Sequence, residues 1–129
     1  MNEPILVVDD NPDNVKLLVF LLKKHGYQVQ TAASAEEALT VLGGFRPALI
    51  LMDIQLPGMD GLQLTRMLKS DPATRDILIL VVTAYAMKSD EERSLEAGCD
   101  GYVAKPIDTR KLPSLIATYL RPAPVPPTN

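Results

Sequence analysis

The sequence has no tryptophan, one cysteine, one histidine and few long apolar runs. Cys99 cannot form a disulfide within the chain, which is typical of proteins in a reducing compartment. One histidine and one cysteine are too few for the usual ligand sets of a zinc site. No apolar run approaches the roughly 20 residues of a membrane-spanning helix. Acidic residues at positions 3, 9 and 10 also argue against a signal peptide. These absences favour a cytoplasmic protein.

An excess of basic charge is missing as well. The formal net charge is −3, so the composition offers no strongly basic surface for nucleic acid or an anionic membrane. The apolar fraction of 47% and the charged fraction of 22% are typical of a globular domain. A chain of 129 residues is long enough to bury one core. We therefore expect one domain that by itself binds neither nucleic acid nor a membrane.

Five apolar stretches of strand length alternate with stretches of helical length. Strands are expected at 5–9, 27–33, 48–53, 77–83 and 101–105. Several of these runs are continuously apolar, which indicates burial on both faces and hence a parallel sheet covered by helices. The pattern predicts an α/β fold, a (βα)5 doubly wound sheet of five parallel strands with helices on both faces.

The expected helices carry signals at their ends. Ser34 opens a capping-box spacing, and Asp60 and Asp108 stand where N-caps are expected. Gly26 follows the first helical stretch, where a glycine commonly ends a helix. Pro113 falls inside the expected last helix and should kink its first turns.

The last nine residues, RPAPVPPTN, contain four prolines. Proline-rich segments are extended and do not build a packed core. We expect a single domain over residues 1–121, followed at 122–129 by a disordered tail or the stub of a linker.

Reactive side chains follow the expected strands at their carboxyl ends. Asp9 and Asp10 follow the first strand, Asp53 the third, Thr83 the fourth and Lys105 the fifth. Because the carboxyl ends of parallel strands meet at one edge of a sheet, these groups should converge. Three close carboxylates repel one another, and oxygen ligands in this number suit Mg²⁺, with Mn²⁺ as an alternative. A carboxylate beside such a cation, a lysine and a hydroxyl is suited to attack phosphorus.

The segments VVDDN, LILMDIQLPGMDG, VVTAYA and VAKPI resemble the receiver domain of two-component response regulators, the CheY-like family. The resemblance covers residues 4–120, with the motifs in the family's order. The stretch AMKSDEERSLEAGCDGYVAKPI resembles in particular DivK-type single-domain regulators and receivers attached to hybrid histidine kinases. It implies the flavodoxin-like strand order 2-1-3-4-5. It also implies signalling by transfer of a phosphoryl group from a histidine kinase or a histidine phosphotransfer protein, with a downstream protein as target.

The resemblance also assigns residues to the metal and the phosphoryl group. Asp53 would be the phosphoacceptor. Asp10 and Asp53 would bind Mg²⁺ directly, together with the backbone carbonyl of Gln55, and Asp9 would act through water. We expect no enzymatic activity beyond promotion of the domain's own phosphorylation and dephosphorylation.

Further positions correspond to the family's switch. Lys105 would contact the phosphoryl group, and Thr83 would move toward it after phosphorylation. Tyr102 would be the aromatic residue that turns inward as Thr83 shifts. The Lys105–Pro106 peptide is expected to be cis. The surface that changes would be the fourth helix, fifth strand and fifth helix, roughly residues 87–120, in a monomer or a weak phosphorylation-dependent dimer.

The run LLVFLL at 17–22 is too continuous for one helical stripe. The resemblance places Leu17, Leu18, Leu21 and Leu22 inward, which leaves Val19 and Phe20 toward solvent. We hypothesise that Val19 and Phe20 form a docking patch for a histidine kinase or phosphotransfer helix. Scattered surface apolar residues are an equally weighted alternative.

Other functions compete with the receiver interpretation. A flavodoxin-like FMN binder would share the fold, but Asp9 and Asp10 would repel the phosphate of FMN. A haloacid-dehalogenase-type phosphatase needs a second acid two residues after its nucleophile, where this chain has Gln55. A phosphorylation-independent pseudo-receiver, or a receiver excised from a hybrid histidine kinase, remain alternatives.

Overall fold

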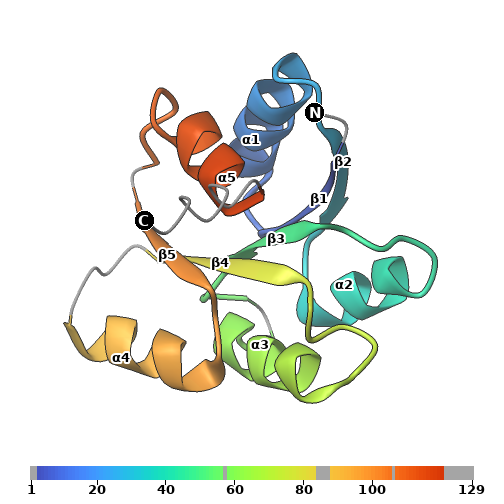
Figure 1. Cartoon of the computed structure of the whole chain (residues 1–129), viewed down its shortest axis with the longest axis vertical. Helices are drawn as coiled ribbons and strands as arrows, with labels where there is room; N and C mark the ends of the chain where they lie inside the picture. The colour runs from blue at the N-terminus through green and yellow to red at the C-terminus, as the bar shows by residue number, and fades with distance from the viewer. Residues whose placement is uncertain (1–2, 57, 84–87, 106, 121–129) are drawn as a thin grey trace, which may run out of the picture.

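The computed structural model describes residues 3–56, 58–83, 88–105 and 107–120. Strands and helices alternate along these residues, and each strand is followed by a helix (Figure 1). The strands are β1 (Pro4–Val8), β2 (Gln28–Ala32), β3 (Leu49–Asp53), β4 (Leu78–Thr83) and β5 (Gly101–Ala104). The helices are α1 (Pro12–Lys24), α2 (Ala35–Leu42), α3 (Gly61–Ser70), α4 (Lys88–Ala97) and α5 (Leu112–Leu120).

The five strands form one parallel sheet in the order β2-β1-β3-β4-β5. This confirms the predicted (βα)5 doubly wound architecture and its flavodoxin-like strand order. Each predicted strand boundary lies within one residue of the observed one. The agreement follows from the strength of the apolar runs, since four residues of β1 and all five of β3 are buried.

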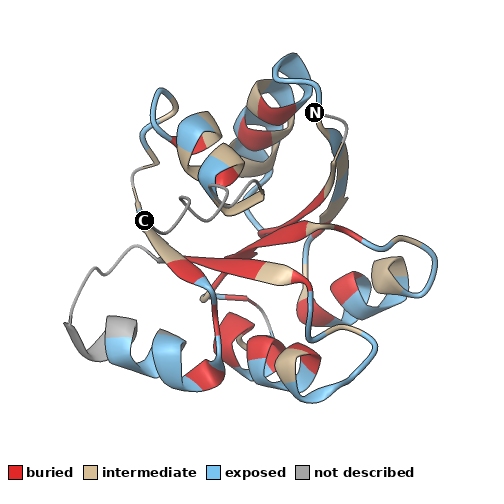
Figure 2. Cartoon of the chain, viewed as in Figure 1, coloured by how far each residue is buried: buried red, intermediate tan, exposed pale blue. Residues whose placement is uncertain are grey.

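Alternate residues of the strands supply two separate cores. Ile5 and Val7 of β1 pack with buried residues of α1 and α5, whereas Leu6 and Val8 pack with those of α2 and α3. Figure 1 shows α1 and α5 on one face of the sheet and α2, α3 and α4 on the other. Figure 2 shows the buried strands between these two helical layers. The sheet is therefore held from both sides, as continuous apolar strands require.

Most of the helix-end signals are confirmed. The Ser34 hydroxyl accepts from the backbone N–H of Glu37 at 3.1 Å, and the Asp60 carboxylate accepts from that of Gln63 at 2.8 Å. Gly26 follows α1 with φ +90°, and its N–H donates to the carbonyl of Lys23. That left-handed conformation strains any residue with a Cβ, which is why a glycine ends this helix.

Three sequence expectations about helices were wrong. Asp108 does not cap α5, which begins at Leu112; its carboxylate accepts from the backbone N–H of Arg110 in the preceding turn. Leu17 is 46% exposed, whereas Leu18 and Leu22 are buried, because one position along a helix turns the side chain by about 100°. Pro113 is the second residue of α5, not an interior one. A helix's first turn has no partner for its N–H groups, so Pro113 removes no helical hydrogen bond there.

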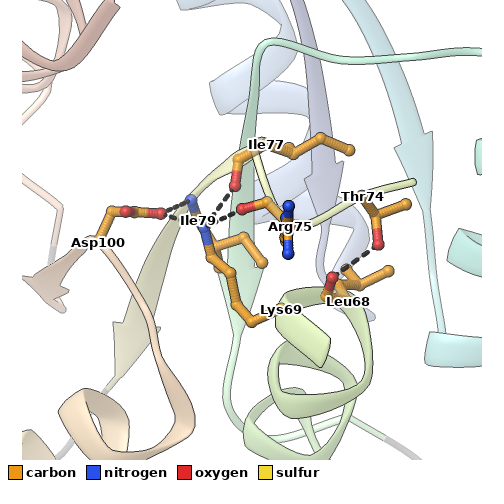
Figure 3. Close-up of polar contacts among 7 residues, drawn as sticks. All are labelled: Leu68, Lys69, Thr74, Arg75, Ile77, Ile79 and Asp100. Carbon is orange, nitrogen blue, oxygen red and sulfur yellow. Dashed lines mark hydrogen bonds and ion pairs between the residues drawn. The ribbon is translucent and has the colours of Figure 1, made fainter. Parts of the chain in front are cut away.

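A polar cluster joins the amino ends of β4 and β5 to the end of α3 (Figure 3). The Lys69 ammonium donates to the carbonyls of Arg75 and Ile77 at 3.1 and 2.7 Å, and pairs with the Asp100 carboxylate at 2.7 Å. The same carboxylate oxygen accepts from the backbone N–H of Ile79 at 2.8 Å. We call these five residues the Lys69 clasp. It holds the end of the sheet opposite the acidic residues.

Some sequence expectations concern residues outside the described ranges. The proline-rich tail at 122–129 and Pro106 are among them. Cys99 is described; it is buried, and that burial raises the pKa of its thiol. Among the described helices, none combines the length and apolar character needed to span a membrane.

Candidate functional site

Three carboxylates meet at the carboxyl edge of the sheet. Asp9 and Asp10 directly follow β1, and Asp53 is the last residue of the neighbouring strand β3. One carboxylate oxygen from each lies within 4.8 Å of the others. Asp9 and Asp53 are 4% and 5% exposed, whereas Asp10 is exposed. The predicted convergence of these three acids is confirmed. We call this group of three carboxylates the acid site.

Backbone turns orient two of these carboxylates. Asp9 accepts from the backbone N–H of Asn11 at 2.9 Å, and Asp53 from that of Gln55 at 3.0 Å. In both cases an aspartate at the end of a strand accepts from the residue two positions later, a local pattern that aspartate favours. Sequence reasoning missed both N–H donors, although an acid followed closely by a turn was a usable signal.

Lys105 follows β5 and reaches the same edge. Its ammonium lies 3.1 Å from Oδ2 of Asp53, so the predicted convergence of Lys105 with the acids is confirmed. The pKa of Asp53 is nevertheless raised above the ordinary value, chiefly because burial disfavours the charged carboxylate. The Gln55 N–H and the Lys105 ammonium act in the opposite direction, and the nearby Asp9 charge adds to the increase. The site therefore carries more negative charge than its own lysine offsets.

Gly61 lets the first turn of α3 approach the end of β3. A Cβ at this position would lie 2.1 Å from the carbonyl oxygen of Asp53. The N–H of Gly61 donates to the carbonyl of Ile54 at 2.8 Å, which ties the helix to the strand exit. The structure shows a contact with the backbone of the acid site.

The remaining predicted positions lie on β4, β5 and α1. β4 ends at Thr83, and the preceding Val82 pairs with Asp53 of β3, so this strand end is beside the acid site. Tyr102 is half-buried in β5. Val19 and Phe20 lie on α1, where Phe20 is 68% exposed. The Lys105–Pro106 peptide involves a residue outside the described ranges.

The acid site has the chemistry of a site for a small divalent cation. All its side-chain donors are carboxylate oxygens, and two of the three residues are buried. Closely spaced buried carboxylates are stabilised by a cation between them. Oxygen ligands of this kind suit Mg²⁺ and Mn²⁺ and not a thiolate-seeking metal.

With this fold and site, the chain belongs to the response regulator receiver domain family. The family model matches residues 5–117, which include the five strands from Ile5 onward and all the residues of the acid site. It is therefore a receiver domain of two-component signal transduction, a signalling domain.

Curated relatives point to one subgroup. Proteins named polar-differentiation response regulator DivK, from Brucella ovis and Brucella anthropi, are 42% identical over 120 residues. The alignments cover 93% of this chain and 98% of each relative. The chain is thus similar to DivK regulators over nearly their whole length.

Solved structures agree. The signal receiver domain of a signal transduction histidine kinase from Syntrophus aciditrophicus is 35% identical, with a TM-score of 0.86, covering 98% of this chain and 95% of that one. The receiver domain of a sensor histidine kinase from Pseudomonas aeruginosa is 32% identical, with a TM-score of 0.84, covering 93% and 98%. That structure has a magnesium ion coordinated in its active-site cleft.

Proposed function

We propose that Asp53 is the phosphoacceptor of this receiver domain. One observation carries the proposal: the buried carboxylate of Asp53 is bonded to the Lys105 ammonium at 3.1 Å and lies beside the carboxylates of Asp9 and Asp10. A nucleophile with an ammonium and cation ligands around it is suited to phosphoryl transfer, where charge on the phosphoryl oxygens must be neutralised.

We propose that this acid site holds Mg²⁺. Asp10 and Asp53 would bind it directly, with the backbone carbonyl of Gln55, and Asp9 would act through water. Mn²⁺ would serve as an alternative. When bound, the cation supplies positive charge that neutralises both the carboxylates and the incoming phosphoryl oxygens. The all-oxygen donor set supports this assignment.

In the proposed transfer, a carboxylate oxygen of Asp53 attacks the phosphorus of a phosphohistidine on a histidine kinase or phosphotransfer protein. The new P–O bond forms as the P–N bond breaks, and the leaving imidazole nitrogen takes a proton from solvent. The Lys105 ammonium changes partners from the carboxylate to a phosphoryl oxygen. Because the ammonium already contacts Asp53, it needs to move only a short distance in that exchange.

The added phosphoryl group carries about −1.5 to −2 charge at neutral pH, enough to bias a two-state surface. We propose that the Thr83 hydroxyl moves toward this charge, that Tyr102 turns inward, and that residues 87–120 then present a changed surface to a downstream protein. A cis Lys105–Pro106 peptide would orient the Lys105 ammonium toward the phosphoryl group. Because Thr83 of β4 pairs with Ala104 of β5 through the backbone, a movement at the end of β4 would be passed to β5.

The phosphoacceptor assignment is tested with acetyl phosphate or beryllofluoride and Mg²⁺. We expect phosphorylation, and the accompanying NMR shifts, in the wild type and no more than about a hundredth of the rate in Asp53→Asn. Asp76→Asn, which removes an exposed carboxylate far from the site in sequence, is the matched control and should behave as the wild type. A response that survives Asp53→Asn contradicts the assignment.

We also propose that Val19 and Phe20 form a docking patch for the phosphodonor protein. The large exposed area of Phe20, on the helix that begins beside Asp10, supports this role. Phe20→Glu should slow transfer from a phosphorylated histidine phosphotransfer protein by about tenfold and leave acetyl phosphate rates unchanged. Leu39→Glu, an exposed apolar residue on α2, is the control. Equal transfer rates in Phe20→Glu and wild type would refute the patch.

Three broader features complete the proposal. We place the receiver domain at residues 1–121, which the family match over 5–117 supports. We propose a cytoplasmic protein, consistent with a lone cysteine, and a monomer or a weak phosphorylation-dependent dimer. Output would pass to a downstream protein and not directly to nucleic acid or a membrane.

A further inference from the structure

The outer edge of β2 is open in the structure. Among the described residues, β2 pairs with β1 and lies at the end of the sheet (Figure 1). Gln28 donates its N–H to Glu3, and the carbonyl of Ala32 accepts from Asp9, so these even-numbered residues direct their backbone groups toward β1. Backbone groups alternate along a strand. Val29 and Thr31 therefore direct their N–H and C=O groups outward.

This edge lacks the usual protection. Natural sheets block exposed edges with charged residues, prolines or bulges. The sequence of β2, QVQTA, contains no charge and no proline, and each of its five residues pairs in register with β1. Two donors and two acceptors are thus arranged for a further strand.

A groove runs beside the open edge. It lies between α1 and β2 and is lined by Val15, Lys16, Val19, Phe20, Lys23, Val29, Gln30 and Thr31. Valine side chains and the exposed Phe20 make its walls apolar, and both charged residues that line it are lysines. Lys16 and Lys23 are seven residues apart on α1, about 10.5 Å along the helix. Side chains on one face of an extended chain recur every two residues, so two carboxylates four residues apart lie about 13 Å apart, within reach of the two long lysine side chains.

We propose that this groove is a docking site for an extended segment of a partner protein that carries aliphatic and acidic residues. The segment would pair with Val29 and Thr31, place aliphatic side chains against Val19 and Phe20, and direct carboxylates to Lys16 and Lys23. Addition of a strand to a sheet edge is an established mode of peptide recognition. This site differs from helix docking on the Phe20 patch because its main-chain bonds come from β2.

Charge argues against two other occupants. A second copy of this chain, paired edge to edge through β2, would bring the two α1 helices together. Lys16 and Lys23 of one copy would then be repelled by the same lysines of the other. The chain's own RPAPVPPTN segment has no acidic residue, and its prolines have no N–H to donate. An acidic partner segment is the occupant that the lysines favour.

The groove also adjoins the acid site. Val15 and Thr31 line both the groove and the neighbouring cavity that contains Asp9 and Asp10. A segment in the groove would therefore share a wall with the acid site without covering Asp53. Its binding should not require phosphorylation.

The test is a titration of ¹⁵N-labelled protein with the capped peptide Ser-Glu-Ser-Val-Ser-Glu-Ser, whose two glutamates and central valine share one face of an extended chain. We expect NMR shifts along β2 and α1, and hydrogen exchange slowed by about tenfold or more at the outward amides of Val29 and Thr31. The same peptide with lysine in place of glutamate should bind at least about tenfold more weakly. Binding of the acidic peptide should weaken as salt is raised.

Charge-reversal variants distinguish binding in the groove from nonspecific attraction to positive charge. Lys16→Glu with Lys23→Glu should weaken binding by about tenfold or more, whereas Lys24→Glu, on the same helix but outside the groove, should change it less than about twofold. Asp53→Asn should bind as the wild type, so a failed phosphoacceptor assignment would leave this inference standing. No shifts at millimolar peptide, equal binding of the lysine peptide, or a protein dimer that protects Val29 and Thr31 without peptide would each overturn the proposal.

Discussion

At the scale of single residues, Asp53 combines burial with charge. Its carboxylate is 5% exposed and pairs with one ammonium, yet its pKa remains raised because loss of solvent outweighs that pairing. A group whose pKa is raised by folding contributes stability below its unfolded pKa, and that contribution is lost as pH rises through the folded value. Ionised Asp53 is therefore unfavourable for folding in the metal-free protein at neutral pH.

Asp53→Asn should consequently stabilise the metal-free protein at pH 7, raising Tm by a few degrees. The gain should shrink as pH falls to about 4, where the wild-type carboxyl is increasingly protonated. Thermal unfolding in EDTA across this range measures both. Asp76→Asn, which removes an exposed carboxylate outside the acid site, is the control. A gain for Asp53→Asn that grows toward acid pH would show that folding lowers the pKa of Asp53 instead of raising it.

At the scale of elements, the two ends of the sheet are held differently. Most charges of the acid site are negative. In the Lys69 clasp, by contrast, the Lys69 ammonium bonds to three acceptors and links α3 to the amino ends of β4 and β5 (Figure 3). The buried Ala97 and Cys99 lie just before Asp100, so the carboxyl end of α4 is anchored beside the clasp. Any movement of α4 should therefore pivot about this end.

Lys69→Met keeps much of the aliphatic stem but removes the ammonium, leaving two carbonyls and the Asp100 carboxylate short of a donor. We expect a loss of about 1–3 kcal/mol in the free energy of unfolding, measured by urea denaturation. Lys16→Met, an exposed lysine in the middle of α1, should change it by less than about 0.5 kcal/mol. Equal losses in the two variants would mean that the clasp contributes no stability.

At the scale of the whole molecule, the sequence predicts what local patterns determine. The strands and the acid site were predictable because apolar runs end directly in Asp9, Asp10 and Asp53. Leu17 was misplaced because a continuous apolar run does not define the rotational phase of a helix. The Lys69–Asp100 pair joins residues 31 positions apart, with no local signal for either member. Long-range pairings of this kind require the fold.

The strand order also has a consequence for synthesis of the chain. β1 is central, yet both of its neighbours, β2 and β3, follow it in the sequence. All three carboxylates are present once residue 53 has been made, whereas Lys105 follows Asp53 by 52 residues. At about 5–20 residues per second, translation separates them by several seconds. On the ribosome, the acidic half of the site therefore precedes its lysine.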